Sequence, residues 1–124
     1  MRISFTEREL DVMSVLWDAG AATVAEVRER LADDFAYTTV LTVLRTLEHK
    51  GHVAHTGEGR AHRYHPLVKR EAAGRTALRR LVEKVFDGSP ELLMTQLVSD
   101  KHLTAEELRR LRRLLEERLR EKKS

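Results

Sequence analysis

The chain has 124 residues, of which 41% are hydrophobic and 35% are charged, and it contains no cysteine. This composition supports a packed core, and it excludes wholesale disorder, disulfide bridges and sites that need a thiolate. The net charge of +3 favours a nucleic-acid partner only weakly, because residues 1–66 hold 8 Lys/Arg against 10 Asp/Glu (−2) and residues 67–124 hold 15 against 10 (+5).

Two capped helices are predicted at the start of the chain. Thr6 and Glu9 have the spacing of a capping box, and Gly20 ends the helix that they open. Its predicted buried face consists of the apolar residues at helical spacing, Leu10, Met13, Leu16 and Trp17. Thr23 and Glu26 form a second capping box, which opens a short helix with an apolar stripe of Val24, Val27 and Leu31.

A third helix is predicted from Tyr37 to Lys50, with Gly51 as its C-terminal stop. At 100° per residue, its apolar side chains cluster on one side: Val40, Val43, Leu44 and Leu47. The opposite side and its flanks hold Thr38, Thr42, Arg45 and His49, with Leu41 and Thr46 at the edges. A polar helix face is most often simply solvated, so this pattern alone does not assign a function.

The context of this helix favours a nucleic-acid interface. The helix follows a short capped helix and precedes a hairpin, which is the order of a helix-turn-helix protein. Hydroxyl side chains are short enough to let a helix enter the major groove, an exposed leucine suits a thymine methyl, and arginine reaches guanine or phosphate. We therefore predict double-stranded DNA as the partner, with contacts from Thr38, Thr39, Leu41, Thr42, Arg45, Thr46 and His49.

A β-hairpin is predicted next, with strands over residues 52–56 and 60–65 around the glycine-bracketed turn at 57–59. Three helices and a terminal hairpin make a winged helix-turn-helix domain, which we assign to residues 1–68. As a wing, the hairpin would place Arg60 at its tip and bring Arg60 and Arg63 to the DNA backbone. The alternative is an ordinary edge hairpin that completes the core through Val53 and Tyr64.

Five of the six histidines fall at positions 49, 52, 55, 62 and 65. Histidine is the commonest metal ligand, so this clustering raises the possibility of a metal site. In a strand, however, residues three apart face opposite sides, and neither the 52/55 pair nor the 62/65 pair makes a two-ligand arm. We therefore expect no metal, and we expect histidines that are solvated or face DNA.

The C-terminal half is predicted to be helical. A helix over residues 70–86 ends at the Asp87-Gly88 break, and Ser89 caps a short helix that begins with Pro90 and ends at Val98. Thr104 and Glu107 open a last helix with a leucine stripe, whose basic end at 118–123 we expect to fray.

Two interpretations of this half remain, packing within its own chain or dimerisation. The winged helix is complete alone, and the remaining helices have more apolar surface than a tail needs. We therefore predict a helical dimerisation domain at residues 69–124. Its contacts would come from Leu78, Leu81, Val85, Leu108, Leu111, Leu115 and Leu119.

Several classes of protein are disfavoured by the sequence. No stretch approaches 18 apolar residues and the N-terminus has no signal-peptide core, so we expect a cytoplasmic protein without a membrane partner. No glycine-rich phosphate loop and no spaced set of nucleophile and base occurs, so we expect neither an enzyme nor a cofactor.

Four consecutive blocks of the chain closely resemble the penicillinase-repressor (BlaI/MecI) family. They are FTERELDVMSVLW at Phe5–Trp17, TVAEVRERL at Thr23–Leu31, AYTTVLTVLRTLEHKG at Ala36–Gly51 and GRAHRYHPLV at Gly59–Val68. The resemblance implies a dimeric repressor on palindromic operators, often beside genes for β-lactam resistance or related stress responses. It also implies that the helix at Thr38–Lys50 enters the major groove and that the helices over 70–120 form an interlocked dimer.

The resemblance further suggests a regulatory protease as a partner. In the antibiotic branch of the family, a membrane-bound metalloprotease sensor leads to a cut at an Asn-Phe bond in the dimerisation segment. This chain has Gln96-Leu97 at the matching position, which puts the same cleavage in doubt, and it lacks the cysteine cluster of copper-responsive relatives.

The sequence thus predicts a homodimeric winged-helix repressor. The alternative is a winged helix that acts as a protein-interaction module, with the basic C-terminal half docking an acidic partner.

Overall fold

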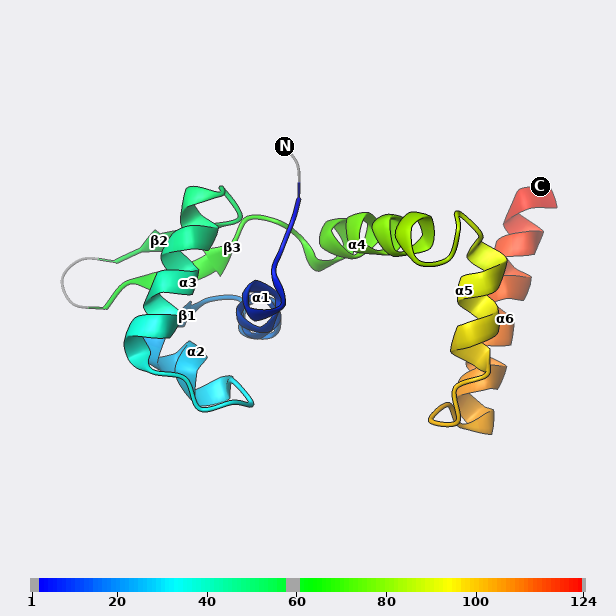
Figure 1. The fold of residues 1–124 in the computed structure, drawn as a ribbon, viewed down its shortest axis with the longest axis horizontal. Helices are drawn as coiled ribbons and strands as arrows, with labels where there is room; N and C mark the ends of the chain where they lie inside the picture. The colour runs from blue at the N-terminus through cyan, green and yellow to red at the C-terminus, as the bar shows by residue number, and fades with distance from the viewer. Residues whose placement is uncertain (1–2, 58–60, 124) are drawn as a thin grey trace. The chain divides into compact units, whose positions relative to one another are not determined.

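The computed structural model describes residues 3–57 and 61–123. The chain forms two compact units, Met1–Leu78 and Arg79–Ser124. The first unit contains the helices α1 (Glu7–Ala19), α2 (Val24–Arg30) and α3 (Tyr37–His49) and a small sheet (Figure 1). The helix α4 (Arg70–Lys84) begins in the first unit and ends in the second, which also contains α5 (Pro90–Val98) and α6 (Ala105–Lys123).

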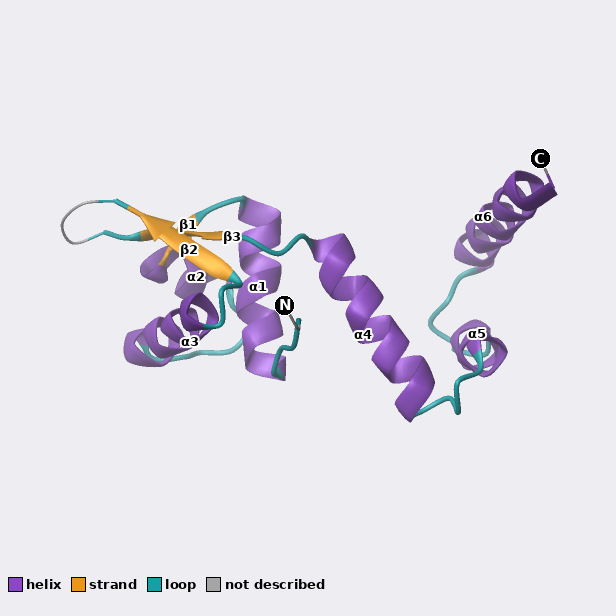
Figure 2. Ribbon diagram, turned by 90° about the horizontal axis from the view of Figure 1, so that it is seen from above, coloured by secondary structure: helices purple, strands orange, loops and turns teal. Residues whose placement is uncertain are grey.

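The small sheet, orange in Figure 2, has three antiparallel strands, β1 (Ala22–Thr23), β2 (Val53–Thr56) and β3 (Arg63–Pro66). Their order in the sheet is β1-β3-β2. The predicted hairpin is confirmed as β2 and β3, although both strands are shorter than predicted. The strand β1 was not predicted, because two residues are too few to show an alternating pattern. It pairs with β3 through Ala22 and Thr23, and so links the start of α2 to the hairpin.

The turn of the hairpin begins at a glycine that no other residue could replace without strain. Gly57 has a φ of +118°, and a Cβ placed there would lie 2.7 Å from the carbonyl oxygen of Ala61. A side chain at this position would therefore be unfavourable both in backbone conformation and in packing. Arg60, the predicted tip of the wing, lies outside the described residues.

The core of the first unit lies between the three helices and the sheet. Its members are buried side chains from every element of the unit up to β3: Val12, Met13, Val15, Leu16, Ala22, Val24, Val27, Val40, Leu44, Leu47, Val53 and Tyr64. The predicted face of α1 was wrong in part, because Leu10 is 39% exposed whereas Val12 and Val15 are buried. Since α1 contacts α2, α3 and β3, its buried face is wider than a single stripe and is rotated away from Leu10.

The predicted capping box at the start of α1 is confirmed, and its carboxylate has a second role. Glu9 Oε1 accepts a hydrogen bond from the Thr6 backbone N–H at 2.7 Å, and the Glu9 N–H donates to Thr6 Oγ1 at 3.1 Å. The same Oε1 also lies 2.9 Å from Lys50 Nζ, at the C-terminal end of α3. Burial raises the pKa of Glu9, but the Thr6 N–H and the Lys50 ammonium outweigh it, so the pKa is lowered from 4.5.

The second unit is helical but buries little of its apolar surface. Ser89 caps α5 ahead of Pro90, and the capping box of Thr104 and Glu107 at the start of α6 is confirmed. The predicted fraying of residues 118–123 was wrong, because α6 continues to Lys123. No described residue of α5 or α6 is buried, and no described helix is long and apolar enough to cross a membrane.

The Glu9 carboxylate should make the first unit sensitive to acid. Its lowered pKa means that its stabilising contribution is complete above pH 4.5 and is lost as the pH falls through the folded-state value. We expect Glu9→Gln to reduce the free energy of unfolding at neutral pH by about 1.5–3 kcal/mol, because the ion pair with Lys50 is lost and the Thr6 N–H then donates to an uncharged oxygen.

Urea-induced unfolding of both proteins at equal concentration, at neutral pH and below pH 4.5, measures this effect. The difference between wild type and Glu9→Gln should shrink on acidification. A remaining pH dependence that begins near 6.5 is expected in both proteins, because burial and the nearby Lys50 lower the pKa of His52 from that value. A difference that stays constant across this range would contradict the role of the carboxylate.

Candidate nucleic-acid interface

The helix α3 has a buried back and a polar front, as the sequence predicted. Val40, Leu44 and Leu47 are buried in the core, which orients the rest of the helix. The exposed residues on α3 include five of the predicted contacts: Thr38, Thr42, Arg45, Thr46 and His49. Thr39 is half-buried, so it offers less surface than its neighbours.

The expectation of an exposed leucine on α3 was wrong. Leu41 is half-buried and packs against the core together with Val43. It lies on the flank of α3, and α3 packs against both α1 and α2, so a residue on that flank is partly covered. Only part of the Leu41 side chain is therefore available to a thymine methyl.

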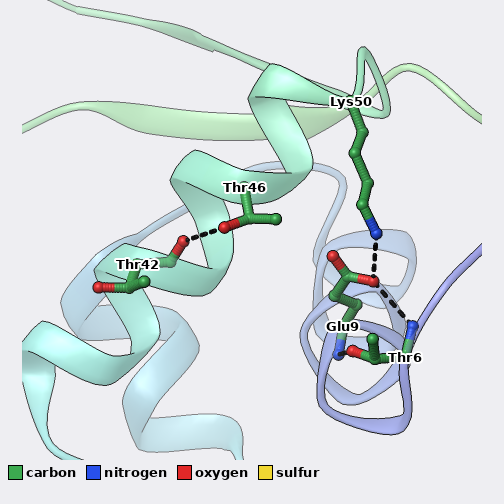
Figure 3. Close-up of polar contacts among 5 residues, drawn as sticks. All are labelled: Thr6, Glu9, Thr42, Thr46 and Lys50. Carbon is green, nitrogen blue, oxygen red and sulfur yellow. Dashed lines mark hydrogen bonds and ion pairs between the residues drawn. The ribbon is translucent and has the colours of Figure 1, made fainter.

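Two of the threonine hydroxyls on the front of α3, those of Thr42 and Thr46, are bonded to their own helix. Thr42 Oγ1 donates to the Thr38 carbonyl oxygen at 2.8 Å. Thr46 Oγ1 donates in the same way to the Thr42 carbonyl oxygen at 3.0 Å, as Figure 3 shows. Each hydroxyl has a single proton, so in this arrangement its oxygen can act only as an acceptor toward a ligand. The front of α3 thus presents acceptors that suit the amino groups of cytosine and adenine, and a contact to phosphate would require the hydroxyl to rotate.

Arg45 is the exposed guanidinium on this front. It forms no ion pair with another residue in the described part of the chain, whereas Arg63 and Arg70 each have a carboxylate partner. A guanidinium without an ion pair has no intramolecular carboxylate contact to break when it binds guanine or phosphate. Arg45 is therefore the side chain of α3 that is best prepared to bind an anion or a base edge.

Arg63, predicted to bind phosphate from the wing, is engaged within the protein. Its Nη2 lies 2.9 Å from Glu26 Oε1, and this ion pair links β3 to the start of α2. The same carboxylate accepts a hydrogen bond from the Thr23 hydroxyl, and the Thr23 hydroxyl and Arg63 together lower the pKa of Glu26. Arg63 is half exposed, so its remaining N–H groups stay accessible, but its orientation is determined by Glu26.

Among the clustered histidines, His52 is buried, whereas His55 and His62 pack against each other at the hairpin. His52 is 1% exposed, against the expectation that it would be solvated or face DNA, and its Nδ1 has no hydrogen-bond partner among the described residues. His55 Nδ1 lies 2.6 Å from Glu48 Oε2, and its ring packs against the His62 ring at 4.5 Å. These contacts connect the hairpin to the last turn of α3, and no described group of three possible ligands could hold a metal ion.

The structure also places a cationic side chain beside the front of α3 that we did not predict from the sequence. Arg8 lies in a groove between the start of α1 and the front of α3, together with Thr42 and Thr46. Its guanidinium stacks on the Phe35 ring at 4.8 Å. The proximity of α1 to Thr42 and Thr46 is a tertiary contact, so no local pattern in the sequence pointed to Arg8.

Comparison with known proteins agrees with this geometry. The penicillinase repressor family model matches residues 5–117. The chain is 36% identical to the transcriptional regulator BlaI of Mycobacterium tuberculosis over 113 residues, which cover 88% of this chain and 80% of that protein. It is 26% identical to the penicillinase repressor of Bacillus licheniformis over 120 residues, which cover 95% and 94% of the two chains.

A solved structure supports the fold of the DNA-binding part. The solution structure of the DNA-binding domain of the repressor BlaI matches with a TM-score of 0.51 and 29% identity, over 58% of this chain and 93% of that one. The predicted fold, a mainly α winged helix-turn-helix with a small β-hairpin, is confirmed. The chain therefore belongs to the penicillinase repressor family, whose members are transcriptional repressors that bind DNA and not enzymes.

Proposed function

We propose that this protein represses transcription as a homodimer on palindromic operator DNA, and that it controls genes for β-lactam resistance or related stress responses. The observation that supports the dimer most is that α5 and α6 bury none of their described residues within their own chain. In this proposal α3 of each protomer occupies one major groove, and residues 69–124 hold the two protomers together.

The apolar residues predicted for dimerisation remain accessible in the single chain. Five of the seven are exposed large hydrophobic side chains: Leu78, Leu81, Val85, Leu115 and Leu119. The other two, Leu108 and Leu111, are half-buried. So many exposed large apolar side chains on two helices are unusual for a monomer and are typical of a protein interface.

The charge distribution explains why a dimer is needed. Residues 1–66 have 8 Lys/Arg and 10 Asp/Glu, so this part of the chain has no electrostatic surplus that would give one protomer strong binding to DNA. One short helix also contacts only a few base pairs. Joining two such helices makes the second contact effectively intramolecular, which raises the affinity without any new contact.

Charged residues in the leucine stripe of α6 should separate the protomers. We expect the double variant Leu115→Asp/Leu119→Asp to be monomeric, because both side chains are exposed in one chain and would place unpaired charge in the dimer interface. Its affinity for a palindromic operator should fall by roughly a hundredfold or more, the loss expected when bivalency is removed.

Sedimentation and DNA titration measure the two effects. Wild type should sediment at twice the chain mass of 14.3 kDa, and so should the control Leu115→Met/Leu119→Met, which keeps apolar side chains of similar volume. A variant that stays dimeric would show that the stripe packs elsewhere. A monomer that binds the full operator as tightly as wild type would contradict dimeric recognition.

Arg45→Ala should weaken operator binding without changing the fold, because the side chain is exposed and has no described ionic partner. We expect a loss of about 1–3 kcal/mol if Arg45 contacts a base edge, and the loss should be specific to the operator. If Arg45 contacts only phosphate, affinity should fall equally on random duplexes. The slope of the logarithm of the binding constant against the logarithm of the salt concentration should then become shallower by about one unit.

Fluorescence anisotropy with operator and random duplexes at several salt concentrations distinguishes these results. Arg75→Ala is the matched control, since Arg75 is an exposed arginine on α4 and its loss changes the net charge equally. If Arg45→Ala bound both duplexes as tightly as Arg75→Ala does, Arg45 would not be part of the interface.

Release of this repressor should not follow the cleavage seen in the antibiotic branch. The Gln96-Leu97 bond replaces the Asn-Phe pair, and both residues lie within α5, whose backbone is already hydrogen-bonded. We expect a β-lactam-sensing protease of the known type to leave this bond intact. Mass spectrometry of the repressor from β-lactam-treated cells provides the measurement, and a fragment that ends at Gln96 would contradict this expectation.

A further inference from the structure

The first turn of α4 is attached to the end of α1 by side-chain contacts of defined geometry. Trp17 Nε1 donates to the Val68 carbonyl oxygen at 2.8 Å. The Arg70 guanidinium lies 5.5 Å from the centre of the Trp17 ring, and its Nη2 lies 2.7 Å from Asp18 Oδ1. We refer to these four residues, Trp17, Asp18, Val68 and Arg70, as the α1–α4 latch.

The latch is joined to the core on one side and to α4 on the other. Trp17 packs against the core and meets the Phe5 ring edge-on at 6.2 Å. Just before the latch, the Leu67 N–H donates to the His52 carbonyl oxygen at 2.8 Å, which holds the chain against the end of the sheet. One turn into α4, Ala73 is buried. The start of α4 is therefore part of the first unit.

The ionic part of the latch contributes orientation more than stability. The side chains of Arg70 and Asp18 are 54% and 64% exposed, and ion pairs that are so exposed add little to the free energy of unfolding. An arginine that stacks on an indole and also binds a carboxylate is nevertheless confined to a narrow range of directions. Such a contact restricts the angle of α4 on α1 without being needed for the core to fold.

We propose that Trp17 and Arg70 are positioning residues for operator binding: the latch determines the direction in which α4 leaves the winged helix, and thereby the spacing of operator half-sites that the dimer accepts. This inference rests on the proposed function, since it requires two winged helices joined through residues 69–124. Neither residue needs to touch DNA for this role.

The length of α4 makes a small change at the latch large at its far end. With 15 residues and a rise of 1.5 Å per residue, α4 is about 22 Å long. A tilt of about 10° at the first turn displaces the far end by roughly 4 Å, which is close to the ~3.4 Å rise of one base pair. Without the latch, the dimer should therefore also accept half-site separations that are about one base pair shorter or longer than the preferred one.

The experiment measures binding of full-length protein to a series of operators whose half-sites differ in separation by single base pairs. Wild type should prefer one separation. In Arg70→Ala and Trp17→Phe, we expect that preference over the neighbouring separations to fall by about fivefold or more, a typical coupling between distant sites. Affinity for a single half-site should not change in either variant. Arg75→Ala, on the same helix but outside the latch, should keep the wild-type profile.

Each other outcome overturns the inference. Unchanged spacing profiles in Arg70→Ala and Trp17→Phe, beside a clear optimum in wild type, would overturn the latch alone. A uniform loss at every separation and on the single half-site would show a merely structural role. A flat wild-type profile would overturn the proposed function as well, and so is distinguishable from failure of the latch.

Trp17 also reports directly on the latch, because it is the only tryptophan in the chain. Removing the guanidinium that lies over its ring should expose the indole, so acrylamide should quench the fluorescence of Arg70→Ala more strongly than that of wild type or Arg75→Ala. Equal quenching in the three proteins would show that Arg70 does not cover the indole, and would overturn the latch itself.

Discussion

The direction in which α3 presents its polar front depends on one buried carboxylate. Glu9 is 4% exposed, and its Oε1 accepts from the Thr6 N–H at the start of α1 and pairs with Lys50 at the end of α3. A buried charge without such partners would be strongly unfavourable, so α1 and α3 can pack only in the arrangement that brings them together. The orientation of Thr42 and Arg45 therefore depends on the packing of α3 against α1 as well as on the buried side of α3 itself.

The elements that were predictable from the sequence are those encoded by local spacing. Each capping box joins residues three apart, and Thr6, Thr23 and Thr104 all cap the helices expected of them. The division of α3 into a buried back and a polar front was also predictable, because a single helix repeat produces it. The short strand β1 was not, since two residues carry no period.

The errors at the candidate site share one cause, which is that a neighbouring element covers part of a helix or strand. Leu41 looked exposed on a helical wheel, but α3 packs against α1 and α2 and covers its flank. His52 belonged to a polar cluster in sequence, yet it is buried against the Phe5 ring at 4.9 Å. Periodicity predicts which side of an element is apolar, and tertiary packing decides how wide the buried side is.

The two units also differ in the contacts that stabilise them. In the first unit, apolar side chains from α1, α2, α3 and the sheet enclose one another, so this part of the chain has a complete core. In α5 and α6 the described apolar side chains have no such enclosure, and a helix as short as the 9 residues of α5 is marginal unless packing supports it. Further stability of α5 and α6 would have to come from contacts that cover their apolar side chains, whereas the core of the first unit holds α3 in place within one chain. The first unit is thus stabilised by contacts within one chain, whereas the apolar side chains of α5 and α6 are left open to a further contact.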